Sequence, residues 1–167
     1  MAGYGTDTGF NAWLAASGLT LPDTAPETAV LRQIGSDYVD GAYEAALQCS
    51  HRTGGFEQER AWPRTGHRVN GQPVPNDLIP LAWVNASYRA AYLEAVTPGW
   101  SNGGTNPGRL TKREKVDTIE REFFNPTETT ENSRIAPGFP FDALINGLVL
   151  PWLCSMTRRA DSLFRVI

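Results

Sequence analysis

The stretch DLIPLAWVNASYRAAYLEAV, residues 77–96, decides the fold of this chain. Asp77 is placed to cap a long helix, and Pro80 falls in its first turn, where the missing backbone donor costs little. Aromatic residues widen the apolar arc beyond one stripe, so we expect other elements to cover this helix on more than one side. One side carries Leu78, Ala82, Asn85, Ala86, Arg89 and Leu93, and the arc is widened by Trp83, Tyr88 and Tyr92.

Three further helices are predicted from capping residues and periodicity. Thr6 or Asp7 caps a short helix that runs to Ala16, residues 24–27 open a long helix to about Cys49, and Asp142 caps a final helix that Pro151 kinks or shortens. The long helix has a predicted apolar stripe and a predicted solvent face. The stripe consists of Val30, Ile34, Tyr38, Ala42, Ala46 and Cys49, and the solvent face of Arg32, Asp37, Asp40 and Glu44.

Residues 110–124 predict a β-hairpin, and Asn70-Gly71 is a second hairpin-turn signal. If Asp117-Thr118 form the turn of the longer hairpin, three successive cross-strand pairs have opposite charge. Because an isolated two-stranded ribbon is marginal in water, it should lie either on a neighbouring subunit or on its own helices. The three pairs are Lys115 with Glu120, Glu114 with Arg121, and Arg113 with Glu122.

The predicted class is mainly α (α+β): a small bundle of about four helices with a protruding β-hairpin, extended loops and a C-terminal arm. One domain spans residues 1–167, with a helical core at about 6–97 and 141–156. The hairpin lies at about 109–124 and the arm at about 157–167. The arm, which contains Phe164 and Ile167, is either a frayed tail or a segment that orders on a partner.

Composition weighs against several functions. The net charge of −3 and pI of about 5.4 lack the basic footprint of a nucleic-acid-binding protein. The longest apolar run, residues 147–153, is too short to cross a bilayer, so we expect a protein with no membrane contact. Without a credible nucleophile or carboxylate pair, no enzymatic activity and no cofactor are expected.

The two cysteines are too few for a disulfide framework, and a reducing cytosol is the simpler assumption. Cys49-Ser50-His51 offers two metal ligands without a second pair at usable spacing. His67 is the only other histidine, and Cys154 is remote in sequence. No zinc site is therefore expected.

Residues 59–66, ERAWPRTG, form a loop in which Pro63 restricts the backbone and two arginines flank a tryptophan. Trp and Arg are frequent interface anchors, which makes Arg60, Trp62 and Arg64 candidate contact residues. The alternative is that Trp62 plugs the edge of its own core beside two solvated arginines.

This loop, together with the opening AGYGTD (residues 2–7), AVLRQ (29–33) and IPLA (79–82), resembles a family of tailed-bacteriophage neck proteins. The chain is similar to the head-tail connector adaptors, or head completion proteins, of that family. Many members carry the label DnaT-like single-stranded-DNA-binding protein. The resemblance runs from residue 1 to about residue 125, and the chain departs from the pattern after Pro126.

The resemblance implies a structural virion protein that is cytoplasmic before assembly and then lies at the head-tail junction. Such adaptors form homo-oligomeric rings of about twelve copies beneath the portal, and they seat a tail-side neck or tail-terminator protein. DNA would pass through the lumen without sequence-specific binding. The candidate contact residues are Arg60, Trp62, Arg64, Arg113, Glu114, Lys115, Glu120, Arg121, Glu122, Phe164 and Ile167. The alternatives are a single-stranded-DNA-binding module, or another neck component such as a stopper or tail terminator.

Overall fold

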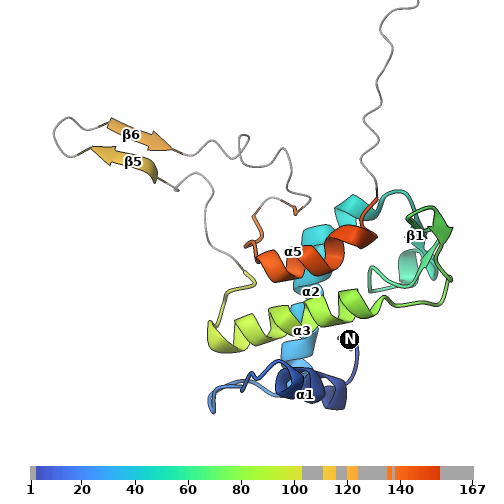
Figure 1. Cartoon of the computed structure of the whole chain (residues 1–167), viewed down its shortest axis with the longest axis horizontal. Coiled ribbons are helices and arrows are strands. Elements are labelled where there is room, and N and C mark those ends of the chain that lie inside the picture. The colour runs from blue at the N-terminus through green and yellow to red at the C-terminus, as the bar shows by residue number, and fades with distance from the viewer. Residues whose placement is uncertain (1–2, 103–110, 116–119, 124–134, 137, 155–167) are drawn as a thin grey trace, which may run out of the picture.

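The computed structural model describes residues 3–102, 111–115, 120–123, 135–136 and 138–154. In Figure 1, α2 crosses behind α3, with α1 and α5 on opposite sides of α3. The described residues are mainly helical with small antiparallel hairpins, which confirms the predicted fold class. The α-helices of this part are α1 (Asp7–Ala16), α2 (Thr28–Tyr43), α3 (Leu81–Val96) and α5 (Ala143–Val149).

Short elements connect α2 to α3 and extend α2 and α5. β1 pairs with β2, and β3 pairs with β4, each in antiparallel register. Asn70 and Gly71 form the turn of the second pair with φ values of 50° and 79°, as an Asn-Gly hairpin turn requires. The bounds are η1 (Glu44–Leu47), β1 (His51–Arg52), η2 (Gly55–Glu57), β2 (Arg64–Thr65), β3 (Arg68–Val69), β4 (Gln72–Pro73) and η4 (Leu150–Trp152).

The predicted caps of the first and last helices are present. The Thr6 hydroxyl accepts a hydrogen bond from the Gly9 N–H at 3.0 Å. The Asp142 carboxylate accepts from the N–H groups of Leu144 and Ile145 at 3.0 and 2.9 Å. α5 ends at Val149, and Pro151 lies in the tighter turn of η4. Both helices therefore begin where their capping side chains can satisfy free backbone donors.

The long helix α2 differs from the prediction in two ways. It ends at Tyr43 and continues as η1, instead of running as one helix to Cys49. Its buried side also includes residues assigned to solvent, because Arg32 and Asp40 are both buried while Val30 is about half exposed. Specific hydrogen-bond partners compensate the burial of these polar groups, and a hydrophobic periodicity does not register such partners.

Two apolar clusters lie on either side of the crossing between α2 and α3. The first is built around Trp62, Trp83 and Tyr43 and is covered by Ile145 and Val149 of α5. The second lies between α1 and the two long helices. Its buried members are Phe10, Leu14, Leu31, Tyr88, Ala91 and Ala95. The central helix α3 is thus covered on more than one side, as its sequence predicts.

At the crossing itself, α2 and α3 approach closely through small residues. A Cβ atom at Gly35 would lie 2.2 Å from the Ser87 carbonyl oxygen and 2.7 Å from the Ala91 nitrogen. Both are backbone atoms of α3, so no side-chain rotation can relieve the overlap. Glycine at position 35 therefore sets the distance between the two longest helices.

The predicted charged ribbon is formed by β5 (Thr111–Lys115) and β6 (Glu120–Phe123), which pair antiparallel. The register places Lys115 opposite Glu120, Glu114 opposite Arg121, and Arg113 opposite Glu122. This is the predicted register, with an irregularity between Thr111 and Arg113. In Figure 1 the two strands stand apart from the helices.

The expectation of free cysteines is wrong for this structure. Cys49 and Cys154 form a disulfide across 105 residues of sequence, with their Cα atoms 5.7 Å apart. η4 brings Cys154 to the turn after η1, where the Cys154 N–H donates to the Ala46 carbonyl oxygen at 3.0 Å. Distance along the chain was therefore a poor guide to distance in space.

None of the helices in the described part of the chain is both long and apolar enough to cross a membrane.

We predict that Gly35→Ala destabilises the protein by about 1 to 3 kcal/mol, because the added methyl group overpacks the crossing. Gly147→Ala is the matched control, since a Cβ there meets no atom within 4 Å. It should gain up to about 1 kcal/mol from the higher helix propensity of alanine. Urea denaturation of both variants measures the difference, and equal stabilities would contradict the close crossing.

Candidate interaction site

Trp62 is a core residue of the folded chain. Only 1% of its surface is exposed, and its ring packs edge-on against three aromatic rings. The centroid distances are 4.8 Å to His67, 6.0 Å to Trp83 and 5.8 Å to Trp152. This placement favours the alternative in which Trp62 plugs its own core, because a partner docking on the surface does not reach the indole.

The carboxylate of Asp40 holds the Trp-Pro loop in this position. It accepts hydrogen bonds from the Tyr4 hydroxyl at 2.8 Å, the Trp83 indole N–H at 3.0 Å and the Ala61 N–H at 3.1 Å. The Tyr4 hydroxyl oxygen in turn accepts from the Trp62 N–H at 3.1 Å. Burial raises the pKa of Asp40, and these hydrogen bonds oppose the rise by favouring the charged form.

The two arginines of the loop are not solvated as the alternative assumed. Arg64 is 4% exposed and donates to the carbonyl oxygens of Leu47, Ser50 and Ala61 at 3.0, 2.6 and 3.0 Å. It thereby satisfies carbonyl groups at the end of η1. Arg60 lies 2.7 Å from Asp37 and 3.6 Å from Asp40, over the ring of Tyr4. Both guanidinium groups therefore serve the fold of their own chain.

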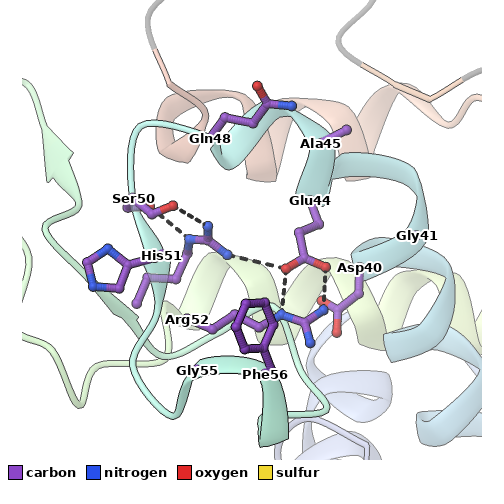
Figure 2. A pocket seen from close by; sticks show the side chains of 11 residues that line it. Asp40, Gly41, Glu44, Ala45, Gln48, Ser50, His51, Arg52, Gly55 and Phe56 are labelled. Carbon is purple, nitrogen blue, oxygen red and sulfur yellow. Dashed lines mark hydrogen bonds and ion pairs between the residues drawn. The ribbon is translucent and has the colours of Figure 1, made fainter.

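An open hollow of about 880 Å³ lies beside this network, between α2, η1 and the turn that carries η2. Figure 2 shows Glu44 pointing into it and the ring of Phe56 at its edge. Phe56 is fully exposed, which is unusual for a phenylalanine and makes it the most accessible aromatic ring among the described residues. The lining residues are Asp40, Gly41, Glu44, Ala45, Gln48, Ser50, His51, Arg52, Gly55, Phe56 and Arg64.

The charges in the hollow neutralise one another. The carboxylate of Glu44 accepts from Arg52 Nε at 2.7 Å and Nη2 at 2.6 Å, and Arg64 lies 3.4 Å away. The hydrogen bond from Arg52 lowers the pKa of Glu44 below its usual value. Since these cations already face a carboxylate, the hollow suits an uncharged or apolar protein segment better than a phosphodiester backbone.

The predicted contact residues fall into three groups in the structure. Arg60, Trp62 and Arg64 come together but point inward. The six charged residues of the ribbon lie at paired positions of β5 and β6. Phe164 and Ile167 lie outside the described residues. Whether any of them contacts a partner stays a prediction.

Sequence reasoning did not single out Asp40, Tyr4 or Phe56. The helical pattern assigns Asp40 to the solvent face of the long helix, opposite the apolar stripe. A weak signal for Tyr4 exists in the flanking glycines, since a Cβ at Gly3 would lie 2.4 Å from the backbone of Arg32. The chain thus passes α2 too closely there for any larger residue, directly before Tyr4, whose hydroxyl donates to Asp40.

The fold and this site define a small, mainly helical protein in which five arginines of the described helical part are paired with carboxylates of the same chain. Residues 3–161 match the profile of the family described as "Putative DnaT-like ssDNA binding protein", and the chain belongs to that family. No curated protein and no solved structure matches the chain.

We predict that Asp40→Asn costs about 3 kcal/mol of stability. One oxygen of the carboxylate would become an NH₂ group, which would face either the Ala61 N–H or the Tyr4 and Trp83 donors and could not accept their hydrogen bonds. Asp37→Asn removes a partly exposed partner of Arg60 and should change stability by no more than about 1 kcal/mol. Thermal and urea unfolding of the two variants tests this. Equal losses would show that Asp40 is not the organising acceptor.

Proposed function

We propose that this chain is a structural protein of the tailed-bacteriophage neck, an adaptor that assembles head to tail into a ring beneath the portal. In this role it extends the DNA channel and seats a tail-side neck protein. The proposal assigns it no catalytic activity and no cofactor. The resemblance of its Trp-Pro loop and three accompanying motifs to connector adaptors is the starting point.

The observation that carries the proposal is the ribbon of β5 and β6. The three opposite-charge pairs in register stabilise the ribbon by roughly 0.2 to 1 kcal/mol each. This is too little to make an isolated two-stranded ribbon stable in water. Such a ribbon is stabilised when it lies against another surface, and a ring supplies the same surface to every copy. The ribbon stands apart from the helices of its own chain in Figure 1, which supports a contact with a neighbour.

We expect this chain in purified virions of the phage that encodes it, as a ring between portal and tail. Cryo-electron microscopy focused on the neck is the measurement, with mass spectrometry of the same particles to identify the chain. Absence of the chain from intact particles would overturn the proposal. The ring would also define the copy number and the residues that each ribbon contacts.

Charge variants of the ribbon test its part in assembly. Lys115→Glu places two carboxylates opposite each other and should reduce incorporation into particles, because the loss recurs in every copy of the ring. The matched control is the double variant Lys115→Glu with Glu120→Lys, which restores the pair with its polarity exchanged. If the single variant assembles like the unaltered protein, the ribbon has no role in the ring.

The family description favours a second candidate, single-stranded-DNA binding. That activity needs accessible aromatic faces beside free cations. Within the described ranges, Trp62 and Trp83 are buried. The exposed Phe56 shares the hollow with Arg52, which is one of five arginines in ion pairs with carboxylates. The net charge of −3 adds no long-range attraction for phosphates.

We therefore predict weak binding to a fluorescent oligothymidine, with a dissociation constant above about 10 μM at physiological salt, within the range of non-specific association. Fluorescence anisotropy over a salt series measures it. Submicromolar binding with a steep salt dependence would instead favour the DNA-binding function. A control with double-stranded DNA separates strand preference from general charge attraction.

A further inference from the structure

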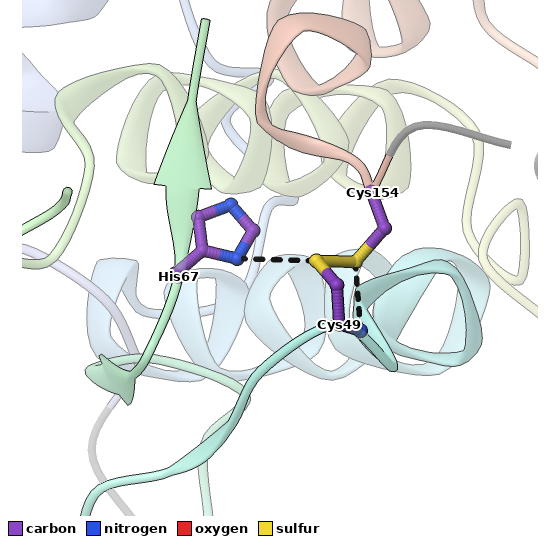
Figure 3. A group of neighbouring side chains, drawn as sticks. All are labelled: Cys49, His67 and Cys154. Atoms are coloured by element: carbon purple, nitrogen blue, oxygen red, sulfur yellow. Dashed lines mark hydrogen bonds between the residues drawn. A yellow bond between two sulfur atoms is a disulfide. The ribbon is translucent and has the colours of Figure 1, made fainter. Parts of the chain in front are cut away.

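Three potential metal ligands that are remote in sequence meet at one point of the fold. Cys49 follows η1, Cys154 follows η4, and His67 lies between β2 and β3 (Figure 3). His67 is 1% exposed, and its Nδ1 atom lies 3.9 Å from Cys49 Sγ. The ligand atoms of all three residues lie within 4.8 Å of one another.

The spacing between His67 and Cys49 is close to that of a tetrahedral zinc site, whereas the two sulfurs must first be released from the disulfide. With Zn–S bonds of about 2.3 Å and Zn–N bonds of about 2.0 Å, neighbouring ligand atoms are roughly 3.5 to 3.8 Å apart. The histidine nitrogen is already near that distance from one sulfur. Once the disulfide is reduced, the two sulfurs can separate to the same distance, because Cys49 and Cys154 both lie outside the helical turns η1 and η4.

We propose that the reduced form of this protein binds one Zn²⁺ ion through the thiolates of Cys49 and Cys154 and the imidazole of His67. Water or a partner's side chain occupies the fourth position. The disulfide in the structure is then the oxidised form of the same site. Either form ties the end of the helical core to the turn after η1.

Reduction of the disulfide precedes zinc binding. A dithiol or phosphine reductant supplies two electrons to the disulfide, and two protons complete the thiols. Zinc binding then releases both protons as the thiolates coordinate. Two thiolates neutralise the charge of Zn²⁺, so the metal centre beside the buried His67 carries no net charge, while Cys49 lies on the exposed side of the site.

One neighbouring group supports this coordination, and a second must move to permit it. The Cys49 N–H lies 3.0 Å from Cys154 Sγ, the distance at which a backbone donor stabilises a coordinated thiolate. The Ser50 hydroxyl lies 2.9 Å from His67 Nδ1 and accepts from Arg64 Nε at 2.8 Å. Ser50 therefore exchanges its contact with the imidazole for one with water or the metal when zinc binds.

The first experiment compares zinc binding by the full chain in its two redox forms. Protein reduced with a phosphine under nitrogen, and protein left oxidised, are each mixed with Zn²⁺ and analysed by native mass spectrometry and by competition with a chromophoric chelator. We expect one zinc ion per reduced chain, with a dissociation constant below about 1 μM, and none on the oxidised chain. Equal binding by the two forms, or no binding by either, would overturn the proposal.

Variants identify the ligands. Cys154→Ser and His67→Asn should each weaken zinc binding by about tenfold or more in the reduced protein. His51→Asn is the matched control, because His51 is exposed and adjacent in sequence to the cysteine turn. If His67→Asn binds zinc as tightly as the His51 variant, the imidazole is not a ligand.

Because His67 is buried, its variant is first checked for folding by circular dichroism. X-ray absorption at the zinc edge of the unaltered, reduced protein provides a test that needs no substitution. Two sulfur ligands and one imidazole nitrogen are expected in the first coordination shell. A shell of oxygen and nitrogen alone would overturn the proposal.

Discussion

The buried carboxylate of Asp40 is the constraint on which the rest of the structure depends. It joins four separate parts of the chain, because the N-terminal Tyr4, the Trp-Pro loop at Ala61 and α3 at Trp83 all donate to this one residue of α2. A buried charge is tolerated only when its hydrogen-bonding capacity is met. The burial of Asp40 therefore requires the loop and the N-terminus to be in place, and links their positions to the α2–α3 crossing.

The same network determines which residues remain available to partners. Arg60 faces the carboxylate of Asp40, and Arg64 donates to the carbonyl oxygens of Leu47 and Ser50. Trp62 fills the aromatic core against Trp83. A loop whose composition indicates a contact site thus serves internal packing. The outer surface near it consists of the hollow with its neutralised charges and the exposed ring of Phe56.

This distribution of charge bears on the family to which the chain belongs. Binding a DNA strand tightly requires cations free to replace its counterions. A conduit through which DNA slides has the opposite requirement, since many phosphate contacts would hold the DNA in place. Arg52 and Arg64, which are paired with Glu44, and the acidic net charge are compatible with a conduit through which DNA slides, as in the proposed adaptor role.

The sequence by itself determined several features that depend on neighbours along the chain, although the predicted cap at Asp77 is wrong, because α3 begins at Leu81 after Pro80 and has no side-chain cap. The caps at Thr6 and Asp142, the Asn70-Gly71 turn and the register of the charged ribbon were all predictable, because each is set by residues within a few positions of one another. Only the tertiary structure decided the burial of Asp40 and Trp62 and the meeting of Cys49, His67 and Cys154. These depend on contacts between segments tens of residues apart, and local periodicity and spacing carry no information about which distant groups will pair.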